Sequence, residues 1–150
     1  MTKIFAHRGA SAYAPENTME AFELAAKQGA DGIELDVHVT KDGEVVVTHD
    51  EKIDRVSNGS GFIKDMTLRE LKRLSFHNHM ESYVGAGIPT LREVLEYVST
   101  TNMDVNIELK TGIYWYPQIE EKTAFIVQET GMHDRVIYSS FNHHSIAKLK

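Results

Sequence analysis

The sequence predicts an α/β protein built on a sheet of parallel strands, and two observations lead to that prediction. Short apolar runs alternate with segments of helical periodicity, a pattern typical of strands joined by helical crossovers. Four of the apolar runs end in charged or titratable side chains, at His7, at Glu34 and Asp36, at His49, and at Glu108. Because such proteins keep their chemistry at the carboxyl ends of parallel strands, we expect these endings to meet in one site.

The first third of the chain contains three predicted strands and one predicted helix. The strands are predicted over residues 3–8, 31–39 and 44–48. The turn Lys41-Asp42-Gly43 joins the last two of them. A helix is predicted over residues 17–28, with Asn17 as its N-cap and Gly29 as its stop signal.

The last third of the chain continues the alternation of helix and strand. Thr90 and Glu93 have the spacing of a capping box. The helix that they open presents an apolar face made of Leu91, Val94, Leu95 and Val98. Strands are predicted over residues 103–110 and 135–139, and helices over residues 118–130 and from Asn142 onward, the last still continuing at Lys150.

Residues 50–88 interrupt this alternation. They include the turn-rich stretch Ser57-Asn58-Gly59-Ser60-Gly61 and one short predicted helix over residues 67–74. Thr67 and Glu70 give that helix a capping box as well. We interpret the segment as an insertion that lies over the strand ends.

Composition excludes several classes of chemistry. Of the 150 residues, 41% are hydrophobic and 25% are charged, an ordinary balance for a soluble globular protein. The net charge is −6 and no basic run occurs, which argues against a nucleic-acid partner. The absence of cysteine excludes disulfides and cysteine-bound zinc, and it fits a cytoplasmic setting. No signal peptide or stretch long enough to span a bilayer is seen, so we expect no stable membrane insertion.

Three carboxylates are the candidate metal ligands. Glu34 and Asp36 are two residues apart on one predicted strand and therefore point to the same face, and Glu108 stands in the same relation to Lys110. Unneutralised carboxylates aimed at one region would repel one another. Hard oxygen ligands without cysteine or paired histidine suit Mg²⁺ or Ca²⁺ better than zinc. The alternative is a set of salt bridges at the rim of the sheet.

Two histidines and two basic residues complete the candidate site. His7 and His49 end separate strands and are the candidate general acid and base, because imidazole titrates near neutrality. The alternative is a structural role for each ring. Arg8 and Lys110 place two positive charges nearby, and both residue types bind phosphate. A divalent metal, two histidines and two cations together indicate phosphoryl-ester chemistry.

Five short motifs, in order and with matching spacing, resemble those of the glycerophosphodiester phosphodiesterase family. They are His7-Arg8-Gly9, Pro15-Glu16-Asn17-Thr18, Glu34-Leu35-Asp36-Val37, His49-Asp50 and Glu108-Leu109-Lys110. The resemblance covers nearly the whole chain. It implies a TIM-type (β/α)₈ barrel with a small insertion after the strand that ends in His49.

The resemblance also implies roles for the site residues. It implies a divalent metal on Glu34, Asp36 and Glu108, an acid–base pair made of His7 and His49, and phosphate binding by Arg8 and Lys110. The implied reaction cleaves a small glycerophosphodiester, such as glycerophosphocholine, into glycerol 3-phosphate and an alcohol. The implied route is attack by the neighbouring glycerol hydroxyl, followed by hydrolysis of the cyclic phosphate. Which histidine acts first as base stays open.

The length of the chain sets a further expectation. A barrel of this type typically has about 250 residues and eight strands, whereas about five strands can be counted here. We therefore expect residues 1–150 to form a single barrel domain that is incomplete at its carboxyl end, or that completes its sheet by self-association.

Two competing functions and two minor residue groups stay open. A lyase on the same scaffold, of the phospholipase D-like or phosphoinositide-cleaving kind, would stop at the cyclic product. A non-catalytic fragment would only bind a phosphodiester or a metal.

His38 shares the face of Glu34 and Asp36, without an expected role as ligand. Tyr114-Trp115-Tyr116 either line the substrate pocket or form a packed loop.

Overall fold

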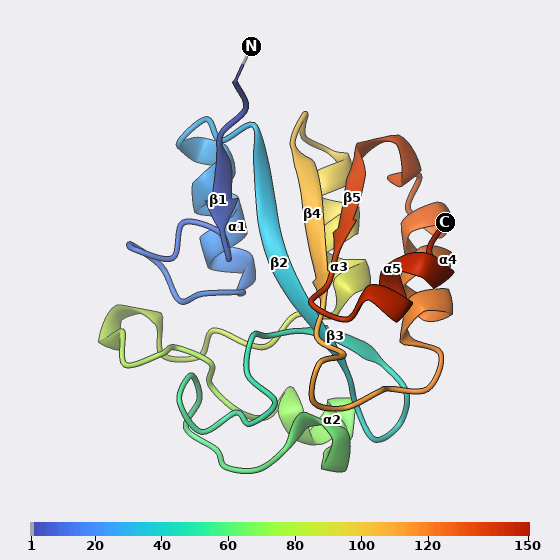
Figure 1. Cartoon of the computed structure of the whole chain (residues 1–150). Helices are drawn as coiled ribbons and strands as arrows, with labels where there is room; N and C mark the ends of the chain where they lie inside the picture. Colours follow the sequence, from blue (N-terminus) through green and yellow to red (C-terminus); the bar gives the residue numbers. More distant parts are fainter. Residues whose placement is uncertain (1) are drawn as a thin grey trace.

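A computed structural model describes residues 2–150 and shows one five-stranded sheet with helices packed against it (Figure 1). The strands are β1 (Phe5–His7), β2 (Gly32–Val39), β3 (Val45–Val47), β4 (Asp104–Leu109) and β5 (Val136–Ser139). The α-helices are α1 (Met19–Lys27), α2 (Leu68–Leu71), α3 (Leu91–Ser99), α4 (Ile119–Glu129) and α5 (His143–Lys148). Three short 3₁₀ helices cover Ile63–Asp65, Glu81–Tyr83 and His133–Arg135. Among residues 2–150, no helix has the length and apolar character needed to cross a membrane.

Four of the strands are parallel, as the alternation of helix and strand predicts. Their order in the sheet is β1-β2-β4-β5, and each neighbouring pair is parallel. Helix α1 connects β1 to β2, and α4 connects β4 to β5. Between β2 and β4 the chain passes through β3, the long segment that follows it, and α3. The carboxyl ends of the parallel strands therefore lie at one edge of the sheet.

The strand that leads to His49 is not one of the parallel strands. β3 pairs with β2 in the antiparallel sense, with Val37 opposite Val47. The turn Lys41-Asp42-Gly43 explains this, because a short connection can join only antiparallel neighbours. β2 runs three residues beyond Asp36, and β3 then brings the chain back, so that the Thr48 amide donates to the Asp36 carbonyl at 3.0 Å. The hairpin thus returns His49 to the level of Asp36.

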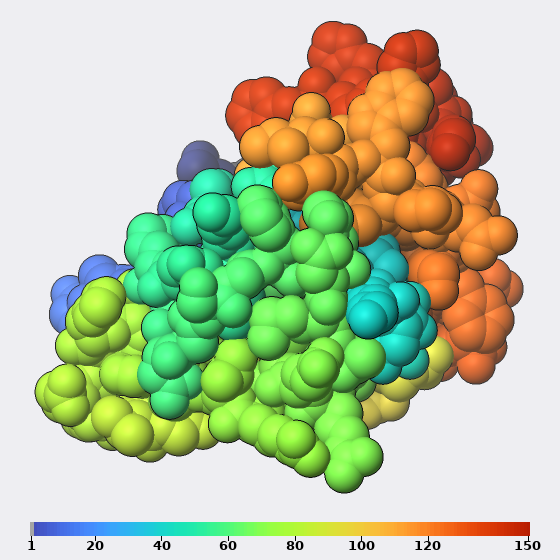
Figure 2. Space-filling view, turned by 90° about the horizontal axis from the view of Figure 1, so that it is seen from below, coloured from blue at the N-terminus to red at the C-terminus, as the bar shows by residue number. Residues whose placement is uncertain are grey.

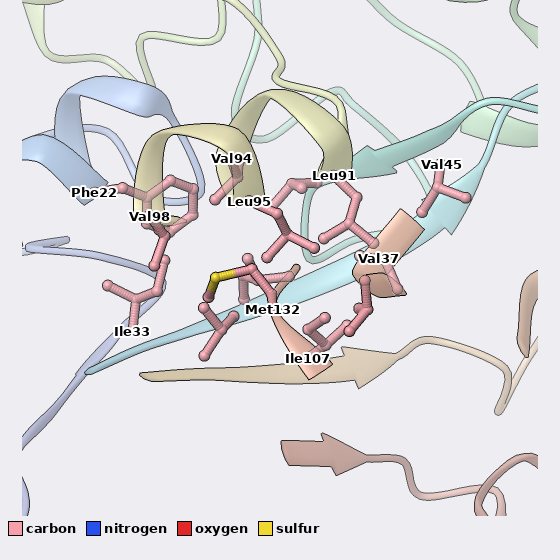
Figure 3. Close-up of a cluster of buried hydrophobic side chains, with 14 of the residues drawn as sticks. Phe22, Ile33, Val37, Val45, Leu91, Val94, Leu95, Val98, Ile107 and Met132 are labelled. Carbon is pink, nitrogen blue, oxygen red and sulfur yellow. The ribbon is translucent and has the colours of Figure 1, made fainter. Parts of the chain in front are cut away.

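The core lies between one face of the sheet and helices α1, α3 and α4 (Figure 3). Alternate residues of β2 and β4 are buried there, namely Ile33, Leu35, Val37, Val105, Ile107 and Leu109. The predicted apolar face of α3 packs against them, and all four of its residues are fully buried. The capping boxes predicted at Thr67 and Thr90 are both present. Burial of this face leaves the opposite face of β2 and β4 to the polar residues.

Three helix boundaries differ from the sequence-based prediction, and one of them is the end of α2, which stops at Leu71 and not at residue 74. The N-cap of α1 is Thr18, whose hydroxyl accepts from the Ala21 amide at 3.3 Å, and not Asn17. Asn17 has a left-handed φ of 57° and uses its side chain elsewhere. Helix α5 ends at Lys148 and does not continue to Lys150. The Leu149 amide bonds the carbonyl three residues earlier, which tightens and ends the last turn.

Residues 50–88 lie beneath the carboxyl ends of the strands in Figure 1 and spread over the face seen in Figure 2. They contain α2 and two of the 3₁₀ helices. A second apolar cluster stabilises them and joins them to β3; it consists of Val46, Ile53, Val56, Ile63, Leu71, Phe76 and Ile88. The segment therefore has its own small core at the edge of the sheet where the candidate site is expected.

Candidate active site

Strand register brings the three predicted metal-binding carboxylates together. Asp36 of β2 is the register partner of Glu108 of β4, and Glu34 is the partner of His7 of β1. One ligand oxygen from each of Glu34, Asp36 and Glu108 lies within 4.8 Å of the others. The two-residue period of β2 puts Glu34 and Asp36 on the face opposite the core.

Two cations lie among these carboxylates, at the positions where phosphate ligands were expected. The Lys110 Nζ lies 3.0 Å from Glu108 Oε1 and 3.6 Å from Asp36 Oδ1. The Arg8 Nε lies 3.5 Å from Asp36 Oδ2, while its Nη1 donates to Glu16 Oε1 at 3.2 Å. Lys110 therefore pairs with Asp36 and Glu108, and Arg8 pairs with Asp36 and Glu16.

Asn17 belongs to the site, although its sequence position suggested only a helix cap. Its Nδ2 donates to Asp36 Oδ2 at 3.0 Å, and its Oδ1 is buried with no hydrogen-bond partner among the residues described. Asp36 itself is 1% exposed. The motif Pro15-Glu16-Asn17-Thr18 contained the signal, but only the fold reveals that the loop after β1 reaches Asp36.

The electrostatics of the cluster favour a divalent cation. Burial raises the pKa of Glu34, and the charges of Asp36 and Glu108 raise it further, to about 7. The Arg8 amide donates to Glu34 Oε2 at 3.1 Å, which opposes this rise only in part. The neighbouring cations thus offset burial and the charges of Asp36 and Glu108 only in part, and Glu34 resists ionisation in the protein alone. Three hard oxygen donors whose ionised forms need a positive partner fit Mg²⁺ or Ca²⁺.

His49 is held in one orientation by contacts on both sides of its ring. Its Nδ1 lies 2.6 Å from Asp50 Oδ1, and its Nε2 lies 3.3 Å from the Lys110 Nζ. Burial alone would raise the pKa of Asp50, but hydrogen bonds from Arg55 and His49 outweigh it and lower the value to about 2. An ionised Asp50 only accepts, so the Nδ1 of His49 bears the proton. Its Nε2 is then the acceptor of the hydrogen bond from the Lys110 ammonium.

His38 supports the backbone of His49 and does not face the carboxylates as a ligand. It is fully buried, and its Nε2 lies 2.9 Å from the His49 carbonyl oxygen. A carbonyl only accepts, so the Nε2 of His38 bears the proton, and its Nδ1 accepts from the Tyr116 hydroxyl at 2.8 Å. Burial lowers the pKa of His38 and thereby favours this neutral form.

His7 is the exposed member of the candidate acid–base pair. Its side chain is 69% exposed, and its Nε2 lies 3.8 Å from Glu34 Oε2. The chain leaves β1 sharply, with left-handed φ angles at Arg8 and Gly9. A Cβ on Gly9 would lie 2.7 Å from the Ala21 carbonyl carbon, so this turn packs directly on α1. His7 therefore sits on the Glu34 side of the cluster, and His49 on the Lys110 side.

A pocket of about 270 Å³ opens beside Lys110. His49, Glu108 and Lys110 line it, together with the apolar side chains of Ile113 and Phe141. The aromatic run Tyr114-Trp115-Tyr116 does not line this pocket. The Tyr114 ring packs against Phe62 and the Tyr116 hydroxyl bonds His38, so these two residues form a packed loop, whereas Trp115 between them is exposed.

The chain is similar in sequence and in fold to known proteins of one family. Residues 7–150 match the glycerophosphoryl diester phosphodiesterase family. A glycerophosphodiester phosphodiesterase of Caldanaerobacter subterraneus is 51% identical over 150 residues, which cover 99% of this chain and 62% of that protein. The crystal structure of a glycerophosphodiester phosphodiesterase from Agrobacterium tumefaciens superposes with a TM-score of 0.90 and is 40% identical.

A third relative is a phosphodiesterase from Oleispira antarctica, solved in complex with the product sn-glycerol-3-phosphate. It superposes with a TM-score of 0.82, is 33% identical, and matches 98% of this chain with 60% of its own. The chain therefore spans about three fifths of the length of these relatives, since it covers 62% of the Caldanaerobacter protein. The similarity confirms the predicted fold class, a TIM-type α/β barrel, of which the four parallel strands described here form a part.

Proposed function

Because the chain belongs to the glycerophosphoryl diester phosphodiesterase family, we propose that the protein hydrolyses small glycerophosphodiesters to glycerol 3-phosphate and an alcohol. The observation that supports this most directly is the convergence of three carboxylates, two cations and two histidines, which come from β1, β2, β4 and the residues that directly follow β1, β3 and β4. The product bound to the Oleispira relative fits the same reaction.

Glu34, Asp36 and Glu108 are the proposed ligands of a divalent cation, Mg²⁺ or Ca²⁺. When bound, such an ion supplies Lewis-acid polarisation of a phosphoryl oxygen and stabilises developing negative charge. Lys110 would bind a phosphoryl oxygen beside His49, since its Nζ already lies between that ring and Glu108. Arg8 would support the phosphate from the Asp36 side.

His49 and His7 are the proposed proton carriers. The unprotonated nitrogen of His49 is its Nε2, which can take the proton of an attacking hydroxyl when Lys110 donates to the phosphoryl oxygen instead. His7, on the other side of the carboxylates and open to solvent, can protonate the departing alcohol. In the second step the roles reverse: water attacks the cyclic phosphate, loses its proton to one ring, and the ring-opening oxygen gains a proton from the other.

Product analysis tests the proposed function. Glycerophosphocholine is incubated with the full-length protein and Mg²⁺ or Ca²⁺, with and without a chelator, and the phosphorylated products are separated. Metal-dependent release of glycerol 3-phosphate is expected. Accumulation of cyclic glycerol phosphate would identify a lyase, and an unchanged substrate would identify a binding protein.

Ion binding should depend on pH, because the pKa of Glu34 lies near 7 in the protein alone. A proton competes with the cation for this carboxylate, so affinity should fall by about tenfold per pH unit below that value and level off above it. Calorimetric titrations at pH 6 and pH 8, in two buffers of different protonation enthalpy, measure both the affinity and the protons released. Equal affinity at the two pH values, without proton release, would contradict the prediction.

Other expectations from the sequence stay predictions. They are the cytoplasmic setting, the absence of a nucleic-acid partner, the possible self-association, and the treatment of residues 1–150 as one domain with an insertion over residues 50–88.

A further inference from the structure

Arg55, a residue of the inserted segment, forms two bidentate ion pairs at the margin of the site. Its Nη1 and Nη2 donate to the two carboxylate oxygens of Glu16 at 3.0 and 2.7 Å. Its Nε and Nη2 donate to the two oxygens of Asp50 at 2.8 and 3.2 Å. The planar guanidinium is suited to such paired contacts, and lysine cannot reproduce them.

These pairs connect three segments that are separate in sequence. Glu16 lies in the loop between β1 and α1, Asp50 directly follows the β3 hairpin, and Arg55 lies in the insertion. From Asp50 the contacts continue to the Nδ1 of His49, and from Glu16 they continue to Arg8. Arg55 is therefore the link between the hairpin that presents His49 and the loop that presents Arg8.

An isolated surface ion pair contributes little to stability, but this arrangement differs in two respects. The Glu16 side chain is only 12% exposed, so its charge needs a partner. Asp50 uses one oxygen, Oδ1, for both Arg55 and His49. A displaced Asp50 would therefore also release the imidazole ring.

We propose that Arg55 is a positioning residue, which holds Asp50 against His49 so that the ring keeps its proton on Nδ1 and directs its Nε2 toward Lys110. The consequence for turnover rests on the proposed function, because it requires His49 to transfer a proton there. The consequence for the orientation of the ring does not, and it can be measured separately.

The test compares Arg55→Met with Arg55→Lys in the full-length protein. Arg69→Met is the matched control, since Arg69 is exposed on α2 of the same insertion and makes no ion pair with the residues described. Two readouts are used: kcat and KM for glycerophosphocholine, and the ¹⁵N-imidazole signal of the His49 Nδ1 proton, assigned by its loss in His49→Gln.

Arg55→Met should lose or broaden the Nδ1 proton signal and lower kcat by about tenfold to hundredfold, the usual effect of removing a supporting contact. KM should change far less, because Arg8 keeps its own contacts with Glu16 and Asp36 when Arg55 is replaced. Arg55→Lys should recover part of the Nδ1 signal and part of kcat, and Arg69→Met should change neither the signal nor kcat.

An unchanged Nδ1 signal in Arg55→Met would overturn the proposal, whatever happens to turnover. The proposal would also be overturned if Arg55→Met raised KM without lowering kcat. It would be overturned as well if Arg69→Met lost as much signal and kcat as Arg55→Met. If Arg55→Met does not fold, Arg55→Lys and Asp50→Asn decide by the same signal, which must weaken in both. If the parent has no activity, the proposed function fails, while the signal still tests the positioning role.

Discussion

Replacing Glu34 or Glu108 by glutamine is expected to abolish both stabilisation by divalent ions and turnover. Each change removes one of the three carboxylates that are the proposed ligands and whose oxygens lie within 4.8 Å of one another. At an ion concentration of 100 Kd, the parent should gain about 2.7 kcal/mol of stability from binding, and the variants should gain little of it. Thermal unfolding with and without Mg²⁺ or Ca²⁺ measures this difference.

The melting temperature of each variant without ions distinguishes loss of a ligand from misfolding. The charges of Asp36 and Glu108 raise the pKa of Glu34, so the cluster is repulsive without an ion. Glu34→Gln removes part of this repulsion and should leave the ion-free melting temperature unchanged or higher. Glu96→Gln, an exposed change on α3, is the control and should keep the parent's response to ions. A variant at Glu34 that keeps the parent's melting shift would exclude the three-carboxylate site.

The fold could be predicted from the sequence where local patterns determine it. The alternation along β2 separates Ile33 and Leu35 from Glu34 and Asp36, because the side-chain period of a strand is two residues. The capping boxes at Thr67 and Thr90 use only hydrogen bonds within one helical turn. These features depend on neighbours in sequence, so they survive in the folded protein.

The expectation of parallel strands is wrong for β3, although the turn before this strand indicates the antiparallel direction. The short turn at Lys41–Gly43 requires an antiparallel neighbour. His49 nevertheless reaches the site, because the hairpin returns the chain to Asp36. The structure therefore brings His49 beside the other predicted site residues, but by an antiparallel hairpin and not by a parallel strand.

The supporting residues could not be predicted, because their contacts depend on packing between distant segments. Asn17 reaches Asp36 across 19 positions, and Arg55 reaches Glu16 across 39. No local period relates such residues. Strand register and the placement of the insertion decide these contacts, and both depend on the apolar clusters that hold the helices and the inserted segment against the sheet.

Alanine in place of His7 or His49 is expected to lower turnover by about 10²–10⁴-fold each, the usual contribution of a general acid or base. Substrate affinity should change less, because the proposed phosphate ligands Arg8 and Lys110 remain. Steady-state kinetics with glycerophosphocholine measure both quantities. His133→Ala is the control, since His133 is exposed before the amino end of β5, at the opposite edge of the sheet.

A substrate with an acidic leaving group separates the two roles. A glycerophosphodiester of nitrophenol needs little protonation of its departing oxygen, so the loss of the general acid should matter much less than with choline. The defect of His7→Ala should then shrink, because His7 is the proposed acid, whereas the defect of His49→Ala should persist. The reverse pattern would exchange the two assignments. Near-normal turnover in both variants with glycerophosphocholine would leave the rings only structural roles, His7 beside Glu34 and His49 between Asp50 and Lys110.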